Sequence, residues 1–397
     1  MYMWQKPNRE MANYVLWSED DGLTWSDPRK IDDIGGEPER IHQLANGDLV
    51  YTLVQSADRT DNRAHIGNML GTLEPVGYYM CYLMASTDGG KSFHLRSVLA
   101  NNQLYADGEV GIVEYAPGQL LSVSRCGDMG GMYGQPSMIR RSLDFGFTWS
   151  EPVLSPYYGQ RAIPGKLQSG NILITYRSAP GTYASYAAVF NPYEDIRYEP
   201  NSNIWDESRC WIEDGTMVLR TDEHYENGVN FIFYPAEDLH ARVEIEAELA
   251  VQEADINGCN ISAGCWIRFE PNRISLADRP EDSFELDATQ FHRYRILRED
   301  GTISIFVDGE LRLSRMVNGL DVRFVRIGNR EGFKRNRSVS RWKSVRVKVE
   351  NQDDACIDWA WSVEQGYPDQ FRRDRILCLD KDGSLMHGNL LKHIEIS

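Results

Sequence analysis

The sequence predicts an all-β chain in which a domain of repeated hairpins is interrupted by a second β domain. Three observations predict this fold class. A turn motif of eight residues occurs three times in the first 150 residues. A second repeat, of strand, glycine turn and strand, alternates with it. Long alternating strands then begin near residue 205, and the first pattern returns after residue 350.

The turn motif has the pattern Ser-x-Asp-x-Gly-x-(Thr/Ser)-(Trp/Phe). Its copies are Ser18–Trp25, Ser86–Phe93 and Ser142–Trp149. Each copy follows one extended run and precedes another, so each is expected inside a hairpin. The aspartate can accept hydrogen bonds from the N–H groups of its own turn, the glycine allows a positive φ, and the aromatic residue packs against a neighbouring sheet.

The second repeat predicts the inner strands of each unit. Its copies are Ile41–Tyr51, Ile112–Leu121 and Gly165–Leu173. When their glycines are aligned, Arg125 and Arg177 fall at the same offset, where the first copy has Val54. One inner hairpin and one turn-motif hairpin together make a four-stranded blade, and residues 1 to about 200 then supply roughly three and a half blades.

The turn motif resembles the Asp box, or bacterial neuraminidase repeat, of the sialidase superfamily of β-propellers. The resemblance implies a propeller of five or six blades, with each box on the outer rim between the third and fourth strands. About 245 residues of this type, at roughly 45 to 50 per blade, correspond to five blades. Superfamily sialidases have six. The box acids Asp20, Asp88 and Asp144 are therefore expected to be structural.

Residues 205–350 have a different pattern, with alternating strands such as Ala241–Leu249 and a hairpin over Thr302–Leu313. This pattern predicts a β-sandwich and resembles the concanavalin-type, lectin-like jelly roll. Strand and glycine patterns return in Asp358–Phe371 and Arg375–Leu385. The expected domains are the first part of the propeller (1–204), an inserted jelly roll (205–350) and a final propeller blade (351–397).

Net charge, the length of apolar runs and the cysteine content restrict the kinds of partner and compartment that we expect. A formal net charge of -17 over 397 residues argues against nucleic-acid binding through bulk electrostatics. No run approaches transmembrane length, so we expect no membrane partner. Seven scattered cysteines, an odd number, favour reduced thiols in the cytoplasm, or a secreted protein if a signal peptide has been removed. We expect no metal and no cofactor. Self-association could complete the propeller edge.

The chemistry is expected where the inner strands of all blades converge. The segments at that position are Glu37–Arg40, Asp107–Glu109, Gln160–Arg161 and Tyr367–Asp369. In sialidases such a pocket holds an arginine triad, a Tyr–Glu nucleophile pair and an Asp acid/base. The resemblance thus implies the catalytic candidates Glu109, Asp107, Asp369 and Tyr367, and the substrate-binding candidates Arg40, Glu39, Arg125, Arg161 and Arg177. Arg125 and Arg177 could equally be ion pairs between blades.

The favoured function is a sialidase-like glycoside hydrolase that removes a terminal sugar from a glycan. One carboxylic acid would protonate the leaving oxygen while a second group stabilises or attacks the anomeric carbon. Two alternatives stay open. One is a non-catalytic carbohydrate-binding protein, and the other is a polysaccharide lyase. In each case the expected partner is a carbohydrate.

Overall fold

The computed structural model describes residues 12–56, 79–102, 106–127, 136–178, 185–202, 204, 207–225, 228–233, 241–317, 324–350, 356–366 and 376–379. Within these ranges the chain forms β-strands and two short 3-10 helices, Glu207–Arg209 and Val363–Gln365. The all-β prediction is confirmed. In the same ranges no helix is long and apolar enough to cross a bilayer. The chain divides into two compact units, residues 1–196 with 374–397 and residues 197–373.

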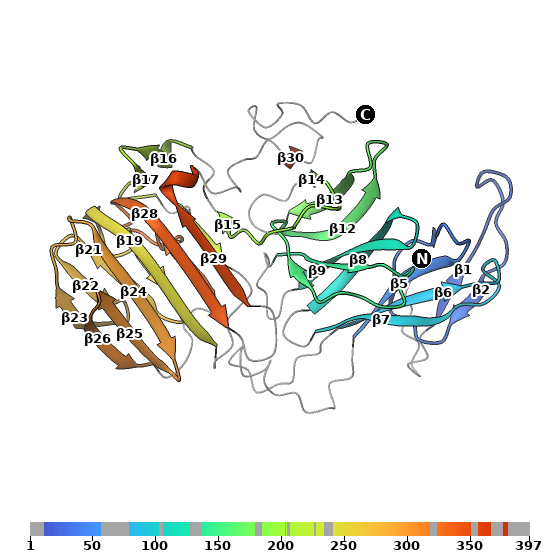
Figure 1. Ribbon diagram of the computed structural model, residues 1–397, viewed down its shortest axis with the longest axis horizontal. Coiled ribbons are helices and arrows are strands. Elements are labelled where there is room, and N and C mark those ends of the chain that lie inside the picture. Colours follow the sequence, from blue (N-terminus) through green and yellow to red (C-terminus); the bar gives the residue numbers. More distant parts are fainter. Residues whose placement is uncertain are drawn as a thin grey trace. The chain divides into compact units, whose positions relative to one another are not determined.

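The first unit consists of antiparallel sheets whose strands follow one another along the chain (Figure 1). A hairpin comes first, of β1 (Asn13–Val15) and β2 (Arg29–Asp32). The next sheet holds β3 (Glu37–Pro38), β4 (His42–Gln43), β5 (Leu49–Ser56), β6 (Tyr79–Ser86) and β7 (His94–Asn102). A third sheet holds β8 (Ala106–Ala116), β9 (Gln119–Gly127), β10 (Met138–Ser142) and β11 (Val153–Leu154), and a fourth holds β12 (Gly159–Lys166), β13 (Ile172–Ser178), β14 (Ser185–Phe190) and β30 (Ile376–Leu379).

Each Asp box lies between the last two strands of its sheet, as the resemblance implied. In the box between β10 and β11, the Asp144 carboxylate accepts hydrogen bonds from the Thr148 backbone N–H (2.9 Å), the Thr148 hydroxyl (2.6 Å) and the Ser142 hydroxyl (2.7 Å). Desolvation is the largest single influence on the pKa of Asp144 and raises it, but the hydrogen bonds from Thr148 and Ser142 together outweigh it, so the pKa is lowered. The equivalent bond from the Thr24 hydroxyl is the largest cause lowering the pKa of Asp20 to about 2. These acids serve the turns that contain them.

Packing joins each sheet of this unit to the next. Three buried apolar clusters contain residues of successive sheets, and their central members are Tyr51 and Phe93, Leu83 and Ile112, and Ile139 and Ile174. The boxes add polar contacts, since the Arg96 guanidinium donates to the Phe145 carbonyl (2.9 Å) from the preceding sheet. Sheets that pack face to face in chain order are propeller blades. Five or six blades remains a prediction, because the described part shows three such sheets and one hairpin.

The second unit is a sandwich of two antiparallel sheets. The larger runs in the order β16 (Cys210–Glu213), β17 (Thr216–Thr221), β28 (Ser338–Glu350), β19 (Arg242–Ala254), β24 (His292–Glu299), β25 (Thr302–Val307) and β26 (Glu310–Met316), with β29 (Ile357–Ser362) also paired to β28. The smaller runs β15 (Asn201–Ser202), β18 (Asn230–Phe233), β27 (Val325–Gly328), β20 (Asn260–Ser262), β21 (Trp266–Glu270), β22 (Arg273–Leu276) and β23 (Arg279–Glu285). Figure 1 shows the long strands β19 and β28 side by side. Phe269 and Tyr294 meet edge to face at 5.1 Å across the core.

The division of the chain differs from the expected boundaries of 205 and 350. Strand β29 pairs with β28 from Ser344 opposite Ser362 to Val349 opposite Ile357. The Trp359 ring packs on Phe233 at 5.2 Å, so this segment belongs to the sandwich. In the described residues the chain returns to the first unit as one strand, β30, on the edge of β14. Alternating apolar residues indicate a strand with one buried face in either domain, so the pattern did not identify the domain.

Candidate functional site

The innermost strands of the three larger sheets of the first unit share an irregularity at one position. Strand β8 loses register with β9 between Gly108 and Gly111, and β12 loses register with β13 between Gln160 and Ile163. In the sheet before them, β3 and β4 both pair with β5 and leave residues 39–41 between them. A β-bulge bends a strand and redirects its side chains. The candidate site residues lie at these breaks.

Two of the bulges hold residues in the left-handed region. The φ angle is 48° at Glu109 and 51° at Arg161. Neither residue is of a type that favours this conformation, and each such position costs on the order of 1 to 3 kcal/mol. Glycine would remove that cost. The charged side chains are therefore present for their contacts, since the backbone alone would favour glycine.

The Glu109 carboxylate lies between two arginines. Its Oε1 accepts from Arg125 Nη1 at 3.2 Å and lies 3.3 Å from Arg161 Nε. Its Oε2 accepts from the backbone N–H of Arg161 at 2.8 Å. The Glu109 side chain is 9% exposed, whereas that of Arg161 is 62% exposed. These hydrogen bonds and ion pairs fix the position of the Glu109 carboxylate between the two arginines.

Close backbone approach brings these strands together. A Cβ built on Gly111 of β8 would lie 2.5 Å from the Ala162 carbonyl oxygen and 2.5 Å from Pro164 Cδ, both in β12. A side chain at this position would push β12 away from β8. Gly111 therefore allows the Arg161 N–H to reach Glu109.

Two further carboxylates from the preceding sheet lie near Arg161. Glu37 Oε1 accepts from Arg161 Nη2 at 2.8 Å. Burial raises the pKa of Glu39, repulsion from Glu37 and Glu109 raises it further, and Arg161 and Arg40 oppose the rise. The Glu39 carboxyl thus keeps its proton to a higher pH than an ordinary glutamate does. Glu37 lies in the converging segment Glu37–Arg40, but its residue type and position alone predict no role for it.

Arg40 joins the same sheet to β12. Its Nη2 donates to the Pro164 carbonyl at 3.1 Å, and its Nε donates to His42 Nε2 at 3.3 Å. Burial and the positive charge of Arg40 lower the pKa of His42 to about 4. His42 is consequently neutral near pH 7 and can accept the hydrogen bond from Arg40.

The remaining candidates lie elsewhere or outside the described residues. The Arg177 guanidinium donates to Gln160 Oε1 on the paired strand, so it makes a contact within its own sheet. Asp107 lies in β8, but its side chain is outside the described part of the structure. Tyr367 and Asp369 lie outside that part entirely. The structure therefore brings Glu109, Arg125 and Arg161 together, with Glu37 and Glu39 beside them. We call these five residues the bulge cluster.

No cluster of three or more His, Cys, Asp or Glu side chains suited to a metal ion occurs among the described residues. The chemistry available to the bulge cluster is that of carboxylic acids and guanidinium groups. These groups can transfer a proton and bind an anionic or hydroxyl-rich molecule.

No protein-family model matches the chain, and no curated protein does. Among solved structures it is similar to a protein of unknown function from Dyadobacter fermentans DSM 18053, with 12% identity and a TM-score of 0.37 over 80% of this chain. It is also similar to a sialidase (12%, TM-score 0.36, 86% of this chain) and to a xylan β-1,4-xylosidase from Bacillus halodurans C-125 (12%, 0.31, 85%). The chain spans 64%, 47% and 81% of these three proteins. Likenesses this distant carry no functional conclusion.

Proposed function

We propose that the protein is a glycoside hydrolase of sialidase-like type, which removes a terminal sugar from a glycan at the bulge cluster. One observation carries the proposal. Two carboxyl groups of different kinds lie in one place: Glu39, whose pKa is raised chiefly by burial so that it can donate a proton, and Glu109, which accepts hydrogen bonds from Arg125 and from the Arg161 backbone and can face a developing positive charge. Glycosidases need one group of each kind.

In the proposed reaction the Glu39 carboxyl donates its proton to the glycosidic oxygen as the bond to the anomeric carbon breaks. Positive charge develops on the sugar ring, and the Glu109 carboxylate stabilises it. Water supplies the hydroxyl that adds to the anomeric carbon, and its other proton returns to Glu39. The products are the free sugar and the shortened glycan, so the step consumes one water and leaves both carboxyl groups as they began.

The arginines would bind and orient the sugar. The Arg161 side chain is 62% exposed, far more than that of its partner Glu109. Its guanidinium can therefore contact a ligand while its Nε holds the Glu109 carboxylate. Arg125 is 25% exposed and fixes the other side of Glu109. A planar guanidinium suits a carboxylate or a pair of hydroxyl groups. Asp107, Tyr367, Asp369 and Arg177 remain candidate contributors.

The test is turnover of a panel of fluorogenic glycosides by the full chain and by two isosteric variants. Glu39→Gln and Glu109→Gln should each lower kcat by about 100-fold or more, because an amide can neither give up the proton nor carry the charge. The matched control is Glu114→Gln, also in β8. The Glu114 carboxylate accepts from the Ala45 and Gly118 backbone N–H groups, each at 2.8 Å, and contacts no arginine of the cluster.

The same panel separates the alternatives. Sugar-dependent thermal stabilisation without turnover would support the carbohydrate-binding protein, in which the Glu109 ion pairs are purely structural. An unsaturated product that absorbs in the ultraviolet would support the lyase. Full activity of Glu39→Gln and Glu109→Gln, with Glu114→Gln behaving the same way, would reject the site.

A further inference from the structure

A groove of about 270 Å³ lies on the larger sheet of the sandwich, on the face turned away from the sandwich core. It is formed at the β16, β17 and β28 end of that sheet. The residues lining it combine one indole, two valines, three arginines and two acids. They are Trp211, Val218, Arg220, Thr221, Asp222, Glu253, Arg337, Val339 and Arg341.

Strand register explains how these side chains meet. Residues directly opposite on neighbouring strands project on the same face, so each row of partners is also a row of side chains. Two rows cross the groove, Trp211–Val218–Arg341 and Arg220–Val339–Glu253. Val218 of β17 is fully buried, and the half-buried Val339 on the neighbouring strand β28 gives the groove an apolar floor. The half-buried Trp211 bounds one side, and arginines stand at opposite corners.

The arginines differ in their partners. Arg341 Nη2 is 2.8 Å from Glu213, and its Nη1 donates to the Thr216 hydroxyl at 3.2 Å. Arg337 is 2.8 Å from Glu253. The exposed Arg220 has no acidic partner among the described residues.

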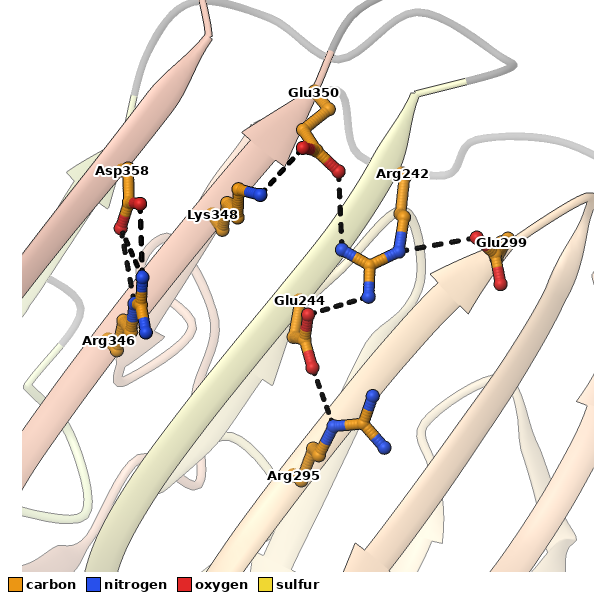
Figure 2. Close-up of polar contacts among 8 residues, drawn as sticks. All are labelled: Arg242, Glu244, Arg295, Glu299, Arg346, Lys348, Glu350 and Asp358. Atoms are coloured by element: carbon orange, nitrogen blue, oxygen red, sulfur yellow. Dashed lines mark hydrogen bonds and ion pairs between the residues drawn. The ribbon is translucent and has the colours of Figure 1, made fainter.

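The rest of this face is charge-compensated. In Figure 2 the Arg242 guanidinium contacts Glu244 at 2.6 Å, Glu350 at 3.2 Å and Glu299 at 3.2 Å. The same view shows three more pairs, Arg295 with Glu244, Lys348 with Glu350 and Arg346 with Asp358. Such a network satisfies its own charges and leaves little for a ligand. The unpaired Arg220 is therefore a local exception on this sheet, and it lies in the groove.

We propose that this groove binds a single sugar ring that carries a carboxylate. The guanidinium of Arg220 pairs with the carboxylate, for which its planar donors are suited. The valine floor and the Trp211 indole take the apolar C–H face of the ring. Glu253 is paired with Arg337 through Oε2, and Asp222 with Arg209 through Oδ2, so the other oxygen of each carboxylate accepts hydrogen bonds from the ring hydroxyls. One uncompensated guanidinium matches one negative charge, so a carboxylate suits it better than a phosphate dianion.

This second carbohydrate site does not depend on the activity proposed for the first unit. All its residues lie within residues 197–373, and none belongs to the bulge cluster. Loss of glycosidase activity in the variants of the cluster would leave binding in the groove unchanged.

The test is isothermal titration of the full chain with the methyl glycosides of glucuronic, galacturonic and N-acetylneuraminic acid. Methyl glucoside and methyl galactoside are the neutral controls, and glucose 6-phosphate is the dianionic one. At least one acidic sugar should bind more tightly than every control. Arg220→Gln should weaken that binding by about tenfold or more, and Trp211→Ala should weaken acidic and neutral sugars alike.

Arg346→Gln is the matched control on the same sheet face, outside the groove, and should bind as the parent does. The binding that Arg220→Gln weakens should persist in Glu109→Gln, whatever that change does to sugar binding at the bulge cluster, which separates this site from the first unit. The proposal is overturned if no acidic sugar binds, if glucose 6-phosphate binds best, or if Arg220→Gln and Arg346→Gln have the same affinity as the parent. An adventitious response to charge would appear equally in Arg220→Gln and Arg346→Gln.

Discussion

The backbone N–H of Arg161 donates a 2.8 Å hydrogen bond to the carboxylate of Glu109, 52 residues earlier in the chain. The bond links the innermost strands of two successive sheets, β8 and β12. Both residues have positive φ angles. Each strained residue thus supplies a contact that the other requires, and the strain is concentrated where the candidate chemistry lies.

The variant Arg161→Gly removes both the backbone strain at this position and the guanidinium group, and so shows which of the two matters for stability and for turnover. Glycine adopts φ near 51° freely and keeps the N–H bond to Glu109, but it removes the guanidinium. We expect the melting temperature to stay within about 3 °C of the parent, because relieved strain offsets the lost and largely exposed ion pairs. Turnover should fall by about 100-fold. A variant that melts much earlier yet retains activity would identify Arg161 as structural.

Glu37→Gln should move the high-pH limb of the activity profile to lower pH. A proton donor is active below its pKa, so activity falls as pH rises through the raised pKa of Glu39. Repulsion from Glu37 is one cause of that raised pKa, so its removal lowers the limit. The measurement is kcat against pH for parent and variant. A high-pH limb that stays in place, or that moves to higher pH, would argue against Glu39 as the proton donor.

The raised pKa of Glu39 also predicts how the stability of the fold depends on pH. A carboxyl whose pKa is raised in the folded state binds more protons folded than unfolded, so its contribution to stability falls as pH rises from the ordinary value through the raised one. Glu39→Gln should therefore flatten the slope of melting temperature against pH in that window. This readout does not depend on finding a substrate.

Gly111→Ala should disturb the site through the backbone. The new Cβ would meet the Ala162 carbonyl at 2.5 Å, and forcing the strands apart costs about 1 to 3 kcal/mol. The Glu109 to Arg161 bond should lengthen, with loss of both stability and turnover. Gly165→Ala, in β12, is the matched control because nothing lies within 4 Å of its Cβ. Equal effects of the two changes would contradict this account.

Asp144→Ala should lower stability and leave activity intact. The Asp144 carboxylate accepts three hydrogen bonds from its own box, and their loss at this partly exposed turn should cost about 1 to 2 kcal/mol. Since its pKa is lowered in the fold, the contribution is present above the ordinary carboxyl pKa and disappears as pH falls through the lowered one. Denaturant melts at neutral and acid pH measure both effects. Asp195→Ala, in an exposed turn without a box, should be near neutral.

The site could be predicted from sequence only in part. Aligned glycines placed Arg125 at a strand end, and the same repeat placed Glu109 and Arg161 at the entry of inner strands. They do meet in the structure. Arg177 binds Gln160 within its own sheet, so its place at the site stays a prediction. A sequence repeat predicts where a residue lies along its strand. The group that its side chain binds depends on residues of other strands.

The amino-acid sequence alone determined the all-β class and the position of each eight-residue turn motif between two paired strands, because these depend on residues close to one another in the chain. Tertiary structure decided that β29 belongs to the sandwich, that burial raises the pKa of Glu39, and that Arg220 has no acidic partner within the part of the chain that the structure describes. These properties follow from burial and from charges on distant strands, whose distances the local sequence does not encode.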